Sequence, residues 1–160
     1  MTNDTVKTDH EITIREMKPS DVETIAELEK KIFPDPWARS AFEELLNEDS
    51  WNALVAETDG RIIGYACFYF VDIEAHLANI GVVEEYRRKS VAKRLLETIL
   101  RRASENNCEY VILEVRPSGT AARAFYKKHG FEILYRRPEY YRHPVEDAYV
   151  MIRYLRDKDR

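Results

Sequence analysis

Hydrophobic and polar residues alternate along some segments of the chain and recur at helical spacing along others. Residues 12–17 alternate apolar and polar side chains, which is typical of a half-buried strand. Val91, Leu95, Ile99 and Ala103 instead share one face of a predicted helix. The same reasoning predicts further strands near 51–58, 61–71, 75–82, 109–115, 131–135 and 148–155, and further helices near 21–32, 40–47 and 120–129.

Turn-forming residues separate these segments. Asp59-Gly60 predicts a hairpin, Gly130 predicts the end of a helix, and two prolines at 34 and 36 interrupt another helix. The resulting order is a strand, two helices, three antiparallel strands, a helix, a strand, a helix and two strands. This order predicts an α/β (α+β) fold, in which a mixed sheet carries helices on both faces.

Length and composition narrow the class of protein. The chain has 160 residues, of which 44% are hydrophobic and 34% charged, and this indicates one globular domain. We assign residues 11–157 to that domain and residues 1–10 to a flexible polar tail, which lacks the apolar core of a signal peptide. No run of ~18 apolar residues predicts a membrane span. Cys67 and Cys108 have no CxxC spacing, and they predict buried free thiols in a reducing cytoplasm.

Charge is distributed unevenly along the chain. Residues 1–60 carry 15 acidic and 6 basic side chains, a net charge of −9, whereas the whole chain carries −4. Between Arg87 and Arg102 lie seven basic residues and a single acidic one, Glu97. A basic cluster on an acidic protein favours a small anionic ligand such as phosphate, with a solvated helix face as the alternative. The overall acidity argues against a nucleic acid as the partner.

The basic cluster begins at a turn between a predicted strand and a predicted helix. The turn reads Arg87-Arg88-Lys89-Ser90-Val91-Ala92 and is followed by Lys93. The first turn of a helix has free backbone N–H groups and a partial positive charge, so it can bind an anion. The small side chains of Ser90 and Ala92 let such a ligand approach the backbone.

This turn resembles the acetyl-CoA-binding motif of the GNAT acetyltransferases, Arg/Gln-x-x-Gly-x-Gly/Ala. Further matches are Phe33-Pro34-Asp35-Pro36-Trp37, Leu113-Glu114-Val115-Arg116, Ala124-Phe125-Tyr126, His129-Gly130-Phe131, Tyr140-Tyr141 and residues 146–151. In combination, over about residues 12–155, they resemble the RimI/Ard1 branch, whose members acetylate the alpha-amino groups of protein N-termini. The resemblance implies the GNAT fold, a mostly antiparallel seven-stranded sheet flanked by about four helices.

The resemblance also implies acetyl-CoA as the cosubstrate and no metal. In the family, the turn that corresponds to Arg87–Lys93 holds the pyrophosphate, and the preceding strand, here Ile80, Gly81 and Val82, pairs with the pantetheine arm. The chain departs from the family where Ser90 replaces the first glycine and where Gly119 replaces an asparagine that contacts the cofactor. Serine resists a positive φ at a cost on the order of 1 kcal/mol, whereas its hydroxyl can donate to a phosphate.

Acyl transfer needs a base that deprotonates the amine and an acid that protonates the leaving thiolate. By resemblance, Glu114 at the end of a predicted strand is the base, and Tyr126 in the following helix is the acid. The structural alternatives are a salt bridge between Glu114 and Arg116 or a nearby lysine, and a core position for Tyr126. The four histidines, His10, His76, His129 and His143, do not show the spacing of a metal site.

The resemblance also indicates where the acceptor enters. In related enzymes, the loop with Phe33 and Trp37 and the loop at 140–144, with Tyr140 and Tyr141, flank the peptide entrance; plain packing of the aromatic pair is the alternative. We therefore expect a cytoplasmic enzyme, a monomer or weak homodimer with no membrane partner, that acetylates a protein or peptide N-terminus, a ribosomal protein being one candidate. Acetylation of a small-molecule amine and non-catalytic acyl-CoA binding are the rival functions.

Overall fold

The computed structural model describes residues 11–155, so the predicted tail at 1–10, His10 and the predicted boundary at 157 lie outside the described residues. The strands are β1 (Thr13–Glu16), β2 (Trp51–Thr58), β3 (Arg61–Val71), β4 (Glu74–Val82), β5 (Tyr110–Val115), β6 (Glu132–Arg142) and β7 (Val145–Tyr154). The helices are α2 (Val22–Ile32), α3 (Arg39–Leu45), α4 (Val91–Glu105) and α5 (Thr120–Lys128), with 3₁₀ turns η1 (Pro19–Asp21) and η2 (Glu84–Tyr86).

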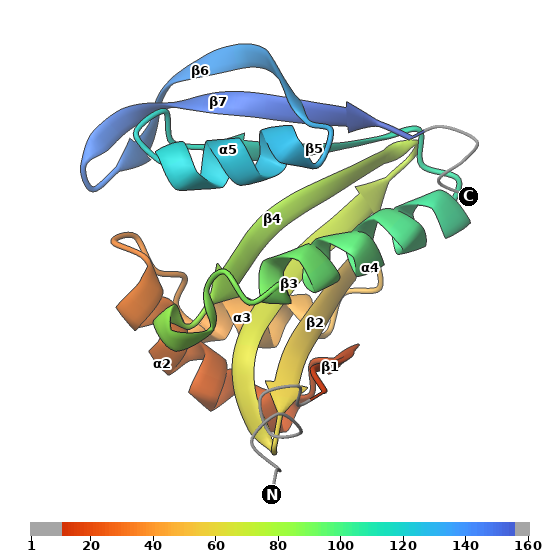
Figure 1. Cartoon of the computed structure of the whole chain (residues 1–160), viewed down its shortest axis with the longest axis vertical. Helices are drawn as coiled ribbons and strands as arrows, with labels where there is room; N and C mark the ends of the chain where they lie inside the picture. Colours follow the sequence, from red (N-terminus) through yellow and green to blue (C-terminus); the bar gives the residue numbers. More distant parts are fainter. Residues whose placement is uncertain (1–10, 156–160) are drawn as a thin grey trace, which may run out of the picture.

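The strands form a seven-stranded sheet in the order β1-β2-β3-β4-β5-β7-β6. β4 and β5 are parallel, because α4 crosses over between them, and the other neighbours are antiparallel. Figure 1 shows β5, β7 and β6 as one group at the top, with β4, β3, β2 and β1 descending from it. The predicted mixed sheet and its four α-helices are confirmed.

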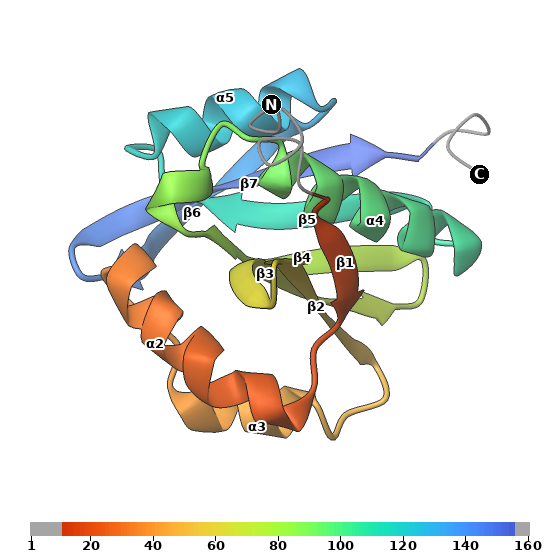
Figure 2. The same cartoon turned by 60° about the horizontal axis from the view of Figure 1, so that its bottom comes forward.

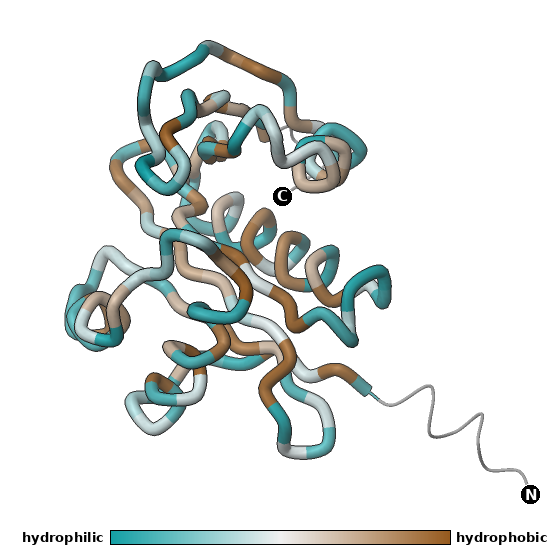
Figure 3. The backbone as a smooth tube through the Cα atoms, turned by 90° about the vertical axis from the view of Figure 1, so that its left-hand side faces the viewer, coloured by the Kyte–Doolittle hydropathy of each residue, from teal (hydrophilic) through white to brown (hydrophobic). Residues whose placement is uncertain are grey.

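Each face of the sheet is covered by its own helices (Figure 2). On one face, α4 buries Val91, Leu95 and Ile99 against the strands, as the helical spacing predicts. On the other face, α2 and α3 bury Ile25 and Phe42 in a second cluster. Figure 3 shows the hydrophobic segments in the middle of the molecule and mostly polar segments at the loops. The two clusters hold the central strands rigidly, and one end of the sheet remains accessible.

The last hairpin differs from the sequence-based prediction. β6 continues to Arg142, so Tyr140 and Tyr141 lie on a strand and not in a loop between the last two strands. Most of β6 is exposed, because it is an edge strand that pairs only with β7. Its sequence therefore lacks the alternation of a half-buried strand, and Pro138 is tolerated at the edge. The pattern of the sequence could not reveal this extension.

Candidate active site

A cleft opens where β4 and β5 separate. Their parallel pairing ends at His76 and Ile112, although β4 continues to Val82 and β5 to Val115. A register shift between β3 and β4 leaves Ala78 without a partner residue, and such a bulge bends and twists its strand. The two strands diverge beyond that point (Figure 1), and a cleft of about 340 Å³ lies between them.

Elements far apart in the sequence line this cleft. The lining comprises Leu77–Ile80 of β4, Leu113–Arg116 of β5, Glu29 of α2, Phe33, Pro34, Asp35 and Trp37 of the α2–α3 connection, Gly119, Ala122 and Tyr126 at α5, and Tyr141 of β6. The structure thus brings together the two predicted catalytic residues and three of the four residues predicted to flank the peptide. Tyr140 lies next to Tyr141, with 4.9 Å between the ring centroids, and its ring contacts the Arg137 guanidinium.

Glu114 is held in the cleft wall by a histidine. Its Oε1 lies 2.8 Å from Nε2 of His76, and Nδ1 of His76 lies 2.6 Å from the hydroxyl of Tyr69. All contacts are satisfied when Tyr69 donates to Nδ1 and Nε2–H donates to the carboxylate. The other oxygen, Oε2, lies 3.7 Å from the guanidinium of Arg137. The alternative of a salt bridge between Glu114 and Arg116 is therefore wrong. Arg116 pairs instead with Asp35 and Glu146.

Tyr126 lines the same cleft from α5. The ring is 7% exposed and packs edge-on against Phe125 and Phe131. Burial, with a smaller effect of Tyr141, raises the pKa of the Tyr126 hydroxyl above its usual range. A tyrosine hydroxyl is protonated at neutral pH even without this shift, and that of Tyr126 has no hydrogen-bond partner within residues 11–155. A buried O–H donor at the edge of the cleft can give its proton to a leaving group.

A buried carboxylate fixes the connection between α2 and α3. Glu29 is 1% exposed and accepts hydrogen bonds from the hydroxyl of Tyr65, from Nδ2 of Asn79 and from the backbone N–H of Trp37. The contacts to three different elements set the position of Phe33–Trp37 against β4. The sequence analysis did not identify Glu29. The signal was available, because Glu29 follows Ile25 by four residues and Ala26 by three and therefore lies on the apolar face of the helix.

A second polar contact joins the α2–α3 connection to the last hairpin. Asp35 accepts hydrogen bonds from Nη2 of Arg116 and from the backbone N–H of His143, both at 3.0 Å. The Arg116 guanidinium also donates to Glu146 and stacks on the ring of Tyr141 at 4.2 Å. The two segments predicted to flank the peptide entrance are therefore linked to each other above β5.

The basic turn lies between the end of β4 and the start of α4. Arg87–Ser90 are exposed, whereas the side chain of Val91 is buried in the core and anchors the helix. The first intrahelical bond runs from Arg94 N–H to the Ser90 carbonyl, so the N–H groups of residues 91–93 are left for a ligand. Ser90 has a φ of 69° and Arg88 a φ of 63°. The sequence-based concern about Ser90 is therefore real, since this position does require a positive φ.

The three strand residues predicted to contact acetyl-CoA, Ile80, Gly81 and Val82, differ in where they lie relative to the cleft and the core. Ile80 lines the cleft, whereas the side chain of Val82 packs in the core. A Cβ on Gly81 would meet the Tyr65 hydroxyl at 2.7 Å, so the glycine leaves room for the Tyr65–Glu29 contact. Any contact of Gly81 and Val82 with a cofactor would therefore be through backbone groups.

Other site classes are not found within residues 11–155. No group of three His, Cys, Asp or Glu side chains is placed to hold a metal ion there, and no helix in that range is long and apolar enough to cross a membrane. Cys67 and Cys108 are buried free thiols, as predicted, and burial raises the pKa of both.

Comparison with known proteins identifies this arrangement. A sequence model of the acetyltransferase (GNAT) family matches residues 22–131, more than half of the chain. The chain belongs to the GNAT acetyltransferase family. The matched range includes both diverging strands, the basic turn and α5, and so most of the residues that line the cleft, although Tyr141 lies outside it.

Individual relatives of this GNAT protein cover nearly its whole length. A Bacillus subtilis (strain 168) protein with the provisional name ribosomal protein bS18-alanine N-acetyltransferase is 33% identical over 139 residues, which are 86% of this chain and 92% of that protein. The crystal structure of the ribosomal-protein-S18-alanine N-acetyltransferase from Escherichia coli has a TM-score of 0.83 at 26% identity, covering 91% of this chain and 94% of the other. Ard1 from Thermoplasma volcanium has a TM-score of 0.84 at 30% identity, with 91% and 99% covered.

The residues of this chain fit acetyl-CoA, the donor that GNAT enzymes use. The free N–H groups at the start of α4 face a turn with Arg87, Arg88 and Lys89, which suits a pyrophosphate. The separation of β4 from β5 leaves room for an elongated arm next to Ile80. The small side chain of Ala92 lets a ligand approach the backbone of the first turn of α4. We therefore retain Arg87–Lys93 and Ile80 as predicted acetyl-CoA contacts.

Ser90→Gly should stabilise the protein and tighten acetyl-CoA binding. Glycine adopts a φ of 69° without strain, so the free energy of unfolding should rise by about 1 kcal/mol. Denaturant melts and calorimetry with acetyl-CoA measure the two effects. Ser90→Ala is the matched control, because it keeps the Cβ and removes only the hydroxyl. Weaker binding in both variants would show instead that the Ser90 hydroxyl contacts the phosphate.

Proposed function

We propose that this enzyme transfers the acetyl group of acetyl-CoA directly to the alpha-amino group of a protein N-terminus, with Glu114 as general base and Tyr126 as general acid. The observation that carries the proposal is that both side chains line one cleft. One is a carboxylate that contacts His76, and the other is a largely buried hydroxyl that can donate a proton.

The reaction follows from these protonation states. Glu114 accepts a proton from the ammonium group, and the neutral amine then attacks the acetyl carbonyl carbon to form the N–C bond; the second proton lost from nitrogen passes to solvent or restores the Tyr126 hydroxyl after it has protonated the thiolate. The C–S bond breaks, and the Tyr126 hydroxyl supplies the proton that the leaving thiolate needs. An alpha-amino group has a pKa near ~8, so the base has a modest task at neutral pH. Cys67 and Cys108 are absent from the cleft lining, which supports direct transfer without an acetyl-cysteine intermediate.

Several observations support a protein acceptor in the cytoplasm. The Bacillus subtilis and Escherichia coli relatives are named as alanine N-acetyltransferases of a ribosomal protein, S18. A ribosomal protein that begins with alanine is therefore the acceptor class that we test first. Two buried free thiols are compatible with a reducing compartment.

A peptide panel tests the proposal. Thiol release from acetyl-CoA should be observed with peptides that begin with alanine and have a free alpha-amino group. It should be absent with the same peptides after N-terminal blocking, even when they contain an internal lysine. Spermidine should also give no thiol release. Turnover on spermidine alone would favour a small-molecule acetyltransferase, and acetyl-CoA binding without any turnover would favour a non-catalytic binding module.

A further inference from the structure

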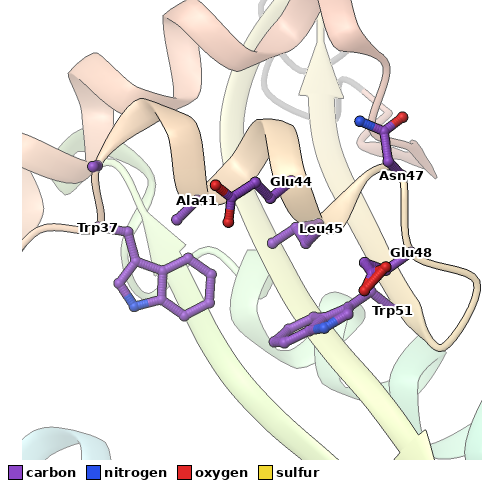
Figure 4. A pocket seen from close by; sticks show the side chains of 8 residues that line it. Trp37, Ala41, Glu44, Leu45, Asn47, Glu48 and Trp51 are labelled. Atoms are coloured by element: carbon purple, nitrogen blue, oxygen red, sulfur yellow. The ribbon is translucent and has the colours of Figure 1, made fainter.

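A second hollow lies next to the catalytic cleft, between α3 and the start of β2. It has a volume of about 790 Å³, and Figure 4 shows the indoles of Trp37 and Trp51 side by side in it, below α3. Glu44 and Glu48 also line it, and Figure 4 shows Glu44 on α3 beside Leu45 and Glu48 next to Trp51. We call this hollow the tryptophan groove. Trp37 lines both the groove and the catalytic cleft, so the two sites adjoin at this side chain.

A row of aromatic rings leads from the tryptophan groove toward the catalytic carboxylate. Trp51 and Tyr69 are paired across β2 and β3, and their ring centroids are 4.6 Å apart. Tyr69 in turn lies 5.0 Å from the ring of His76, which contacts Glu114 at 2.8 Å. Because paired residues project from the same face of a sheet, these side chains form one continuous, partly exposed strip. The strip begins where α3 ceases to cover the sheet.

The charge of the tryptophan groove is uncompensated. Glu44 and Glu48 are exposed and form no ion pair within residues 11–155, whereas the adjacent Glu43 pairs with Arg39. None of the lining residues is basic. Neither indole N–H has a hydrogen-bond partner within the described range, so both can donate to the backbone of a bound chain. Carboxylates next to indole faces attract a cation, and the guanidinium of arginine suits this combination.

We infer that the tryptophan groove binds basic side chains of the acceptor downstream of its terminal residue. The inference rests on the proposed function, because it places the acceptor amine at Glu114. An extended peptide advances about 3.4 Å per residue, and the aromatic steps of 4.6 and 5.0 Å separate Trp51 from His76. Roughly the third to fifth residues of the acceptor therefore reach the groove. The substrate class is an N-terminal segment that is arginine- or lysine-rich at those positions.

Two peptides that differ only at positions 3–5 test this inference. One carries arginine at all three positions and the other carries glutamine. The kcat/KM of the wild type should be about tenfold higher on the arginine peptide at low salt, and the ratio should fall at high salt because exposed charges are screened. The double variant Glu44→Gln/Glu48→Gln should lose most of this preference. Equal kcat/KM values on the two peptides would overturn the inference.

A matched control separates the groove from the net charge of the protein. Glu23→Gln/Glu27→Gln removes the same two charges from the exposed side of α2, away from the groove. That variant should keep the preference for the arginine peptide. An equal loss in both double variants would assign the effect to long-range attraction and would overturn the groove as a binding site.

A binding measurement keeps the test independent of catalysis. The chain contains two tryptophans, and both line the groove, so intrinsic fluorescence reports its occupancy. The N-terminally acetylated arginine peptide, which cannot be a substrate, should change the emission, and the glutamine peptide should not. An unchanged emission would overturn the inference even if peptides are acetylated. An emission change without acetylation of any peptide would leave the groove standing and contradict the proposed function.

Discussion

Glu114→Gln should lower kcat by roughly 10²-fold at neutral pH, with little change in acetyl-CoA affinity. Glutamine keeps the shape of the side chain and can still accept the hydrogen bond from His76, but it cannot take the proton of the amine. The loss should be greatest at low pH, where the amine is charged, and should shrink well above pH ~8, where the free amine predominates. A pH–rate profile on one accepted peptide measures it.

The neighbouring surface residue Glu109→Gln is the matched control for Glu114. It makes the same chemical change just before β5, outside the cleft lining, and should leave the profile unchanged. A Glu114→Gln profile parallel to that of the wild type, with unchanged melting temperature, would show that Glu114 is only a structural partner of His76. Another residue would then have to act as the general base.

Tyr126→Phe should also lower turnover by roughly 10²-fold, because the leaving thiolate loses its proton donor. The ring fills the same space against Phe125 and Phe131, and the lost hydroxyl leaves no partner unpaired within the described residues. Stability and the dissociation constant of acetyl-CoA should therefore hardly change. Single-turnover kinetics, thermal melting and calorimetry distinguish these effects.

Tyr154→Phe, on an exposed tyrosine at the end of β7, provides the comparison for Tyr126. Its turnover should equal that of the wild type. A Tyr126→Phe enzyme with normal turnover would return this residue to a core-packing role, and a large loss of acetyl-CoA affinity would indicate a binding role instead.

Local patterns predicted the elements well where the strands are buried. The strands at 51–58 and 61–71 agree with β2 and β3, which are buried on both faces, because their short apolar runs and the Asp59-Gly60 turn between them are local features of the sequence. β6 was predicted too short, since its exposed residues carry no hydrophobic period. A pattern that reports burial cannot locate a strand that is not buried.

The site could be predicted only in part. The resemblance supplied Glu114 and Tyr126, but the contact of Glu114 with His76 spans 38 residues, and the contact of Asp35 with Arg116 spans 81. Both depend on the order of strands in the sheet, which periodicity does not encode. The same is true of Glu29, whose three hydrogen-bond partners come from segments that meet only in the folded chain.

The link between Asp35 and Arg116 has a consequence for how an acceptor enters. The α2–α3 connection is fixed to β4 through Glu29, and Asp35 joins it to Arg116 just after the end of β5, so hydrogen bonds tie this connection to both strands that line the cleft. Widening of the cleft at this point would require the Asp35–Arg116 contact to break. An extended terminus needs less widening than a loop that carries an internal lysine, so this contact would favour an alpha-amino group over a lysine side chain.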